Sequence, residues 1–286
     1  MPFEKSLENR ITQALPHLSR SHKKLARFVL DNSLFVAFAS IIELSEKTGV
    51  SAATVVRFCQ AIDYAGYPNL QATVRAGLPT YIQKTQQLEQ QNGVANRDET
   101  ISRVFDLDRQ NLTRTLQSLN VEHFDAAMRE IAKASDILVV AGGLSAGPAL
   151  YLAHSLQVMG FNARVVLNGG TQLALELTRL RPTSILIGIS VWRYITDTVQ
   201  AIDYAQRIGA KRIAITDSLV SPLAQRVDYA FQAVTEGVSH SLSLTAIITL
   251  VNAFVAALSF MCPKETTRAL RKIDKAYRQA KLVMTE

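Results

Sequence analysis

The chain has 286 residues, of which 48% are hydrophobic and 19% charged, and its formal net charge is +7. This composition is typical of a folded protein with room for two domains and excludes long disorder. No stretch reaches the roughly 18–20 uninterrupted apolar residues of a membrane helix. The N-terminus carries Glu4, Lys5 and Glu8 and lacks the apolar region of a signal peptide. We therefore expect a cytoplasmic protein.

The two cysteines, Cys59 and Cys262, lie far apart in the sequence, each among apolar neighbours. Their spacing is neither that of a metal site nor that of a disulfide framework. We expect two buried free thiols, no metal and no cofactor. The positive net charge suits a polyanionic partner, although residues 263–286 alone hold seven Lys and Arg against three Asp and Glu.

The first 79 residues follow a helical period, and no strand pattern interrupts them. We expect four amphipathic helices: one closed by Pro16, one preceded by Ser21, one between Ser40 and Gly49, and one that begins at Ser51. Gly49 can adopt the left-handed conformation that ends a helix. Ser51 is a natural N-cap for the next helix. The short connection between the last two helices is that of a helix-turn-helix.

The helix after Ser51 would lie in the major groove of DNA with its N-terminal residues nearest the bases. Thr54 can bind a base or contact a thymine methyl, and Arg57 can reach guanine or phosphate. An upstream basic segment suits phosphate. The alternative is an ordinary helical hairpin with solvated charges. The predicted DNA-binding residues are Lys23, Lys24, Ser51, Ala53, Thr54, Arg57 and Gln60.

Residues 80–120 begin with a glutamine-rich segment and continue in a helical pattern, so we expect a helical linker whose apolar stripe packs on the second domain or on a partner subunit. From residue 121, short β-rich runs alternate with helical patterns, which indicates a doubly wound, mostly parallel sheet. A long helix over 242–261 and a basic helix over 264–284 close the chain. The predicted strands are Ile137–Ala141, Arg164–Leu167, Ile185–Ser190, Arg212–Thr216 and Tyr229–Gln232.

Two predicted loops meet at the carboxyl edge of this sheet, where open α/β sheets bind ligands. The first loop, residues 142–148, has two glycines that allow close approach of a ligand. Its Ser145 can cap the next helix or donate its hydroxyl. The second loop contains Trp192, Arg193 and Tyr194. Because a loop at a strand end is a poor place to bury the only tryptophan, we expect it to contact a ligand. A plain strand–helix turn and a solvated arginine are the alternatives.

Two motifs carry a family resemblance. The segment Val50-Ser51-x-x-Thr54-Val55-x-Arg57-Phe58 resembles the RpiR family of transcription regulators, a match that covers most of residues 15–78. The following Tyr64-x-Gly66-Tyr67 departs modestly from the family's Gly-Phe-x-Gly-Phe. The turn Gly142-x-x-Ser145, together with residues 212–224, resembles the sugar isomerase (SIS) domain, the usual C-terminal partner in that family.

This resemblance implies an α/β fold with three parts. An all-helical helix-turn-helix domain would occupy residues 1–79 and a helical linker residues 80–120. A five-stranded, doubly wound SIS-like sensing domain with C-terminal helices would occupy residues 121–286.

In SIS domains phosphosugars sit across the first loop and a serine-rich third-strand loop, which by resemblance points to Ser145, Ser190 and Thr196. The common loop is Ser-x-Ser-Gly-x-Thr, whose glycine lets backbone amides wrap a phosphate. Residues 191–194 contain no glycine, but Arg193 could supply a bidentate charge. We expect an anionic effector, either a phosphosugar or a sugar acid. The predicted ligand-binding residues are Gly143, Ser145, Ser190, Arg193, Tyr194, Thr196 and His240.

A sugar-phosphate isomerase is the main alternative, with Glu236, His240 or His154 as acid and base. An isomerase has no use for a helix-turn-helix, so we expect a regulator without catalytic residues. A pure interaction module with a vestigial pocket is a third possibility. Because operators are commonly palindromic, the expected partners are double-stranded DNA, a small effector and a second copy, in a homodimer or homotetramer.

Overall fold

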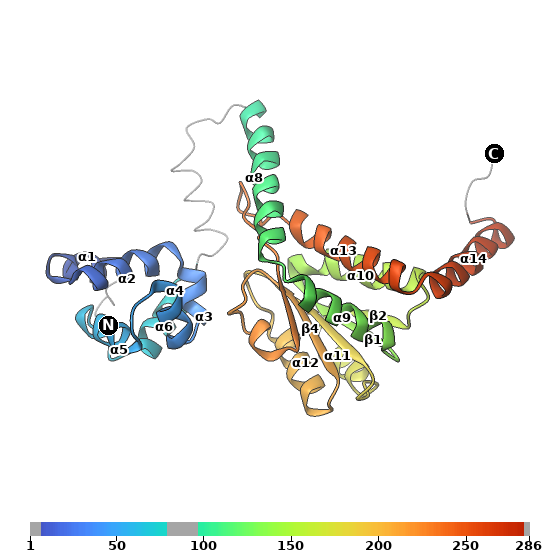
Figure 1. The fold of residues 1–286 in the computed structure, drawn as a ribbon, viewed down its shortest axis with the longest axis horizontal. Coiled ribbons are helices and arrows are strands. Elements are labelled where there is room, and N and C mark those ends of the chain that lie inside the picture. Colours follow the sequence, from blue (N-terminus) through green and yellow to red (C-terminus); the bar gives the residue numbers. More distant parts are fainter. Residues whose placement is uncertain (1–6, 79–96, 283–286) are drawn as a thin grey trace. The chain divides into compact units, whose positions relative to one another are not determined.

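The computed structural model describes residues 7–78 and 97–282 (Figure 1). The chain divides into two compact units, residues 1–87 and 88–286, and each has its own hydrophobic core. The glutamine-rich start of the predicted linker lies outside the described residues. Among those described, no single helix is both long and apolar enough to cross a membrane. Only the last two helices taken together would qualify, and the chain bends by 104° between them.

The N-terminal unit is helical throughout its described residues. Its second helix begins two residues earlier than the sequence pattern predicts, because the Ser19 hydroxyl accepts the His22 N–H at 3.3 Å and so caps the helix at Arg20. The pattern also missed two short helices, α3 and α6. The elements are α1 (Leu7–Ala14), η1 (Leu15–His17), α2 (Arg20–Asp31), α3 (Ser33–Phe38), α4 (Ile41–Thr48), α5 (Ala52–Ala61) and α6 (Tyr67–Ala76).

Side chains of α6 hold the end of α3. The Tyr67 hydroxyl donates to the Ala39 carbonyl at 2.8 Å, and Gln71 Nε2 donates to the same oxygen at 2.6 Å. The Arg75 guanidinium donates to the Ala37 carbonyl at 2.9 Å. The last carbonyls of a helix have no partner within the helix. These bonds therefore fix the point at which the chain enters α4.

The C-terminal unit contains, in its described residues, a five-stranded parallel sheet in the order β2-β1-β3-β4-β5. β1 and β3 are buried at every position, as expected where helices cover both faces of a sheet. Each strand lies within one residue of its predicted bounds. The strands are β1 (Ile137–Ala141), β2 (Ala163–Val166), β3 (Ile185–Ile189), β4 (Lys211–Thr216) and β5 (Tyr229–Gln232).

Alternate side chains of the strands build two cores. Val139 and Ile187 belong to a core shared with α9 (Val121–Lys133), α10 (Ala146–Val158) and α13 (Thr245–Met261). The intervening side chains of β1 and β3 pack with α11 and α12 on the opposite face. The chain winds from β1 outward to β2 and then returns to β3 on the other side, which opens a crevice at the carboxyl ends of β1 and β3. The remaining elements are α8 (Arg97–Ser118), η2 (Gly143–Ser145), α11 (Gly170–Leu177), α12 (Thr196–Arg207), η3 (Ala224–Arg226) and α14 (Pro263–Ala280).

α8 forms the described part of the predicted linker and packs along α13. Its apolar stripe is only partly covered within the chain. Leu112 packs against the sheet core, whereas Ile101 is 55% exposed and Leu116 is 72% exposed. The uncovered part of the stripe is available to another surface.

Candidate functional site

The turn between α4 and α5 has the geometry that the sequence predicts. Gly49 ends α4 in the left-handed conformation, at φ +68°, and donates its N–H to the Ser45 carbonyl at 2.8 Å. The Ser51 hydroxyl accepts the Thr54 N–H at 3.2 Å and so caps α5. α5 is thereby set against α4 as the second helix of a helix-turn-helix.

A row of polar side chains follows the outer face of α5. The hydroxyls of Ser51 and Thr54 are 2.9 Å apart, and Arg57 Nη2 donates to Thr54 Oγ1 at 3.5 Å. Ala53 and Gln60 lie on the same exposed face. The structure thus brings the five predicted residues of the recognition helix onto one surface, with the small residues at its N-terminal end.

α2 lies beside the turn and supplies cations. Lys24 Nζ is 3.7 Å from the position that a Cβ atom on Gly49 would occupy. Lys23 and Lys24 line a surface groove with Arg27, which the sequence analysis did not select. The His22 ring contacts the ring of Phe58 edge-on, with centroids 5.9 Å apart. Burial, followed by the charge of Arg57, lowers the pKa of His22, so the imidazole is neutral at pH 7.

A small cavity lies in the second unit at the carboxyl ends of β1 and β2, beside the start of α12. Its volume of about 20 Å3 is room for one water-sized group. Apart from Gly142, one of the two glycines of the first loop, sequence reasoning did not select its lining residues, because they come from segments that only the sheet brings together. The residues that line it include Gly142, Asn168, Gly169, Ile195, Asp197 and Thr198.

None of the predicted ligand-binding residues of the two loops lines this cavity. Gly143 is exposed at φ +57°, a conformation that favours glycine. Ser145 is buried and makes no capping bond to α10. Ser190 is also buried, and its hydroxyl accepts the Ile195 N–H at 3.2 Å, which closes the loop after β3. Thr196 is exposed as the first residue of α12.

The expectation that Trp192 is not buried is wrong. The residue is only 8% exposed, and its N–H donates to Asp217, just after β4, at 2.8 Å. The Tyr194 hydroxyl donates to the other Asp217 oxygen, also at 2.8 Å. Burial raises the pKa of Asp217, and these hydrogen bonds offset only part of that effect. Arg193 is exposed, and its guanidinium lies 4.9 Å from the centre of the Trp192 ring.

The loop therefore departs from the Ser-x-Ser-Gly-x-Thr pattern in a specific way. Counted from Ser190, the second serine, the glycine and the threonine of that pattern fall on Trp192, Arg193 and Ile195. The threonine that the resemblance assigned to Thr196 therefore falls one residue earlier. Trp192, at φ +62°, takes the left-handed conformation in this loop. Ile195 packs against Gly142, where an added Cβ would meet its side chain at 3.4 Å. An apolar side chain thus lines the cavity where the pattern has a hydroxyl.

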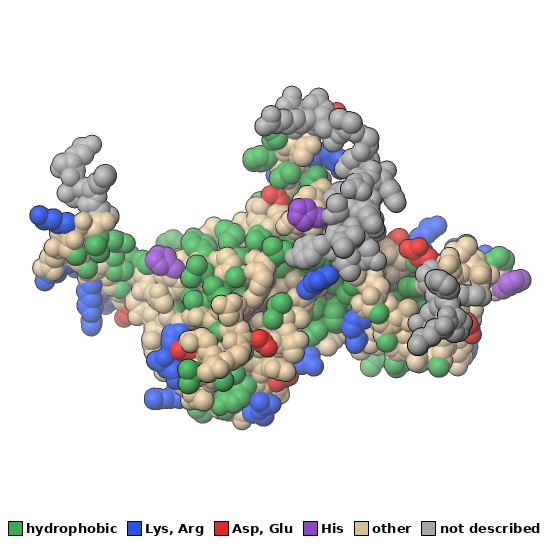
Figure 2. Space-filling model, turned by 180° about the vertical axis from the view of Figure 1, so that it is seen from behind, with side chains coloured by type: hydrophobic (Ala, Val, Ile, Leu, Met, Phe, Trp, Pro, Cys, Tyr) green, Lys and Arg blue, Asp and Glu red, His purple; other side chains and the backbone are tan. Residues whose placement is uncertain are grey.

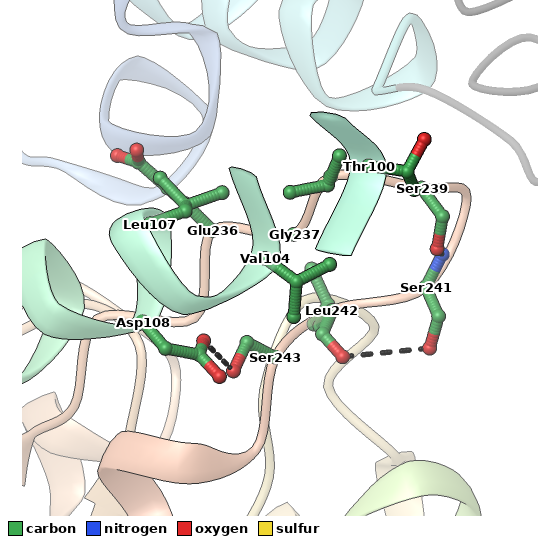
Figure 3. Close-up of a pocket in the computed structure, with 11 residues that line it drawn as sticks. Thr100, Val104, Leu107, Asp108, Glu236, Gly237, Ser239, Ser241, Leu242 and Ser243 are labelled. Carbon is green, nitrogen blue, oxygen red and sulfur yellow. Dashed lines mark hydrogen bonds between the residues drawn. The ribbon is translucent and has the colours of Figure 1, made fainter. Parts of the chain in front are cut away.

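The three side chains that could serve as acid or base in an isomerase are either paired with another residue or exposed. Glu236 forms an ion pair with Arg114 of α8 at 2.6 Å, and its carbonyl accepts a hydrogen bond from Asn111 at 2.8 Å. His240 is exposed in the same segment between β5 and α13, and His154 is exposed on α10. Figure 3 shows the pocket that this segment forms with α8, with Asp108 directed at Ser243. Among the described residues no three His, Cys, Asp or Glu side chains gather as metal ligands would.

Comparisons with known proteins cover both units. Residues 5–80 match the helix-turn-helix domain model of the rpiR family, and residues 130–259 match the SIS domain model. The sugar isomerase domain of an RpiR transcription factor from Sphaerobacter thermophilus is 40% identical, with a TM-score of 0.60, and covers 61% of this chain and 97% of its own.

Two further proteins match over greater lengths. The Vibrio vulnificus NanR protein, solved in complex with ManNAc-6P, is 20% identical with a TM-score of 0.65, covers 98% of this chain and 100% of its own, and shares the fold. A Haemophilus influenzae protein named an uncharacterized HTH-type transcriptional regulator is 25% identical over 224 residues, 77% of each chain.

Proposed function

Because the chain belongs to the RpiR family of transcription regulators, we propose that it binds a DNA operator under the control of a small anionic carbohydrate-derived metabolite. One observation carries this proposal. A single chain joins a helix-turn-helix that has an exposed polar face to a SIS-type sheet that has a cavity at its carboxyl edge.

The outer face of α5 supports contact with DNA. Small residues at its N-terminal end let the helix approach the floor of the major groove. Arg57 follows one turn later and is long enough to reach a base edge or a phosphate. Lys23 and Lys24 supply charge next to the turn, where phosphates would pass. We assign base contacts to Thr54 and Arg57, and phosphate contacts to the two lysines.

The carboxyl edge of the sheet supports a metabolite site. The NanR neighbour was solved in complex with ManNAc-6P, and open α/β sheets bind ligands at the carboxyl edge of their strands. Arg193 is the exposed cation in the loop after β3 and suits a carboxylate or phosphate. Gly143, Ser190 and Tyr194 shape the two loops. Ser145, Thr196 and His240 are the remaining proposed ligand-binding residues.

The ion pair of Glu236 argues against the isomerase. A general base must lie within hydrogen-bond reach of the substrate proton that it abstracts. The Glu236 carboxylate is instead bound to Arg114, on a helix that precedes the sheet. The curated relative is likewise named a regulator.

Homo-oligomer formation is also part of the proposal. Large apolar side chains stay exposed on the second unit, including Leu150 at 52% and Phe260 at 85%. Figure 2 shows hydrophobic side chains among the Lys and Arg of the arm formed by α14. Exposed apolar patches of this kind are typical of protein interfaces. A second copy would place two recognition helices on a palindromic operator.

Fluorescence anisotropy with DNA from upstream of its own gene tests the proposal. The full chain is titrated at several salt concentrations, with and without sugar acids and sugar phosphates. We expect salt-dependent, sequence-preferring binding that one class of metabolite alters. Absence of DNA binding under all conditions, together with turnover of a sugar phosphate, would contradict it.

A further inference from the structure

α14 carries an apolar stripe that its own chain leaves uncovered. Leu270, Ile273 and the ring of Tyr277 follow the spacing of one helix face, and Leu270 is 41% exposed. α14 packs on α10 and α13 near its start, where Thr266 is buried, but residues 274–280 are exposed throughout. Most of the stability of a helix in a protein comes from the packing of its apolar face. The second half of α14 therefore has a face suited to a surface outside its own chain.

α8 presents a second uncovered stripe. Ile101 and Phe105 lie one turn apart and are 55% and 69% exposed, and Leu116, three turns further on, is 72% exposed. Other residues of the same helix pack along α13. Exposed apolar patches on a soluble protein are typical of interaction surfaces. α8 and α14 are 22 and 18 residues long, so their apolar faces can pack against each other over several turns.

The two stripes lie at opposite ends of α13. The Thr245 hydroxyl at the start of α13 donates to Asp108 of α8 at 2.7 Å, whereas α14 follows the other end of α13 after a bend of 104°. The 17 residues of α13 span about 25 Å, so α14 is too distant to cover the α8 of its own chain. Figure 1 shows both helices extending from the α13 layer toward the same side. A second copy related by a two-fold axis across this layer would bring each α14 beside the α8 of the other copy.

The charges of the two helices are complementary. α14 has six Lys and Arg against two Asp and Glu, whereas residues 99–108 of α8 have three acids and one arginine. Two α14 helices from different copies would repel each other if they packed together. On the acidic half of α8, a basic helix gains both apolar burial and charge attraction. The α8 of a second copy is therefore a surface that suits α14.

We propose that two copies of the chain exchange these contacts, with α14 of each copy packed along α8 of the other. The stripe that contains Leu270 lies against the stripe formed by the partner's Ile101 and the partner's Phe105. The inference rests on the proposed homo-oligomer and names the surfaces that form it. Because α8 follows the DNA-binding unit in the chain, each contact holds the linker helix of one copy on the other copy.

The first test measures dimer dissociation of the full chain by sedimentation equilibrium. Leu270→Gln replaces an apolar side chain of the α14 stripe with a polar one of similar helix propensity. Because a two-fold dimer contains the contact twice, we expect the dissociation constant to rise roughly tenfold or more. Arg268→Gln introduces the same residue on the opposite, exposed face of α14 and is the matched control, with an expected change of less than about threefold. Helical circular dichroism checks that both variants fold.

The second test separates a contact between α8 and α14 from contacts between like helices. One variant carries Ile101→Gln and Phe105→Gln on α8. The other carries Leu270→Gln and Ile273→Gln on α14. Each variant alone loses both copies of the contact, whereas a mixed dimer keeps one intact α14 on one intact α8. We therefore expect the mixture to dimerise more tightly than either variant alone, which pairing of α8 with α8 or of α14 with α14 would not produce.

The outcomes distinguish this interface from the proposed function. A Leu270→Gln variant that dimerises like the wild type overturns the interface, as does a mixture that dimerises no more tightly than its components. Reduced salt dependence of DNA binding in Arg268→Gln, with dimerisation intact in Leu270→Gln, would assign α14 to DNA instead. A monomeric wild type that binds its operator overturns the interface and leaves the DNA-binding proposal standing. If the dimer responds as expected but binds no DNA, the interface stands and the proposed regulator fails.

Discussion

Tyr194 donates its phenolic proton to Asp217 at 2.8 Å, which ties the loop after β3 to the end of β4. The same carboxylate accepts the Trp192 N–H and so supports the left-handed backbone of that residue. A residue with a side chain pays roughly 1–2 kcal/mol for this conformation. The loop at the proposed effector site is therefore held in a preformed shape by a buried acid of the neighbouring strand.

Tyr194→Phe should destabilise the second unit. The variant removes a hydrogen bond to a charged group, and such bonds contribute about 1.5–3 kcal/mol. Urea unfolding followed by Trp192 fluorescence measures this unit, since it holds the only tryptophan. Tyr277→Phe on exposed α14 is the control and should unfold as the wild type does. Equal midpoints for both variants would contradict the role of the Tyr194 hydroxyl.

The buried Asp217 also predicts a pH dependence. Burial raises its folded pKa above the ordinary value of 3.8, against the hydrogen bonds from Tyr194 and Trp192. The folded state thus binds the proton more tightly, and the stability linked to this group is lost as pH rises through the raised pKa. As pH rises above the ordinary carboxyl pKa, Asp217→Asn should therefore gain stability relative to the wild type.

Asp228→Asn should change the pH dependence of stability in the opposite direction and serves as the control. Burial raises the Asp228 pKa, but the hydrogen bonds and charge of Arg212 outweigh burial and lower it below 3.8. The stability that this carboxylate contributes is present above the unfolded pKa and is lost as pH falls. The variant should lose stability relative to the wild type as pH rises. If stability relative to the wild type changed with pH in the same direction in both variants, the pKa directions assigned to Asp217 and Asp228 would be contradicted.

Local chemistry made the helix-turn-helix predictable. The left-handed Gly49 and the capping Ser51 follow from residue type and position, and the five strands follow from apolar runs bounded by polar turns. Ser19 was missed as a cap because Ser21 has the same chemistry two residues later. Such local choices depend on which alternative packs better.

The cavity was less predictable because it depends on contacts between distant segments. Gly142, Asn168 and Asp197 meet only through the crossovers between β1, β2 and β3. The Trp192 N–H donates to Asp217, which follows β4 and is 25 residues away in the chain. A polar pair in the first turn of a helix that follows a strand, such as residues 197 and 198, is the one signal that could have indicated the cavity.

Arg57→Ala and Lys23→Ala should separate base recognition from phosphate binding. Loss of Arg57 should weaken operator binding by about 1–3 kcal/mol and reduce the difference in affinity between the operator and unrelated DNA. Loss of Lys23 should weaken binding to all sequences and reduce the salt slope by about 0.9. Anisotropy titrations at several salt concentrations on operator and scrambled DNA measure both effects. An unchanged preference in Arg57→Ala would remove this residue from the base-contacting set.

Gly49→Ala should destabilise the first unit through its backbone. There is room for a methyl group, because the nearest atom is Lys24 Nζ at 3.7 Å, so only the positive φ opposes the change. The expected cost is about 1–2 kcal/mol. Gly49→Asn is the control, since asparagine tolerates this conformation better. Loss of helical circular dichroism without a change in Trp192 fluorescence assigns the transition to this unit.

Asp108→Ala should loosen α8 from the start of α13 within the second unit. The Asp108 carboxylate accepts hydrogen bonds from the hydroxyls of Ser243 and Thr245, the latter at 2.7 Å, at the start of α13. It therefore joins two helices and places a negative charge at a helix N-terminus. Asp106, two residues earlier, is exposed and pairs only with the exposed Arg109 among the described residues. Such surface pairs contribute about 0–1 kcal/mol.

Hydrogen exchange along α8 measures the difference between these two acids. Asp108→Ala should speed exchange in α8 and at the start of α13, whereas Asp106→Ala should leave both near wild type. Because α8 is the described helix that leads from the first unit into the second, loosening it should also reduce any effect of a metabolite on DNA affinity while effector affinity stays unchanged. Equal exchange in the two variants would show that the Asp108 contacts do not anchor α8.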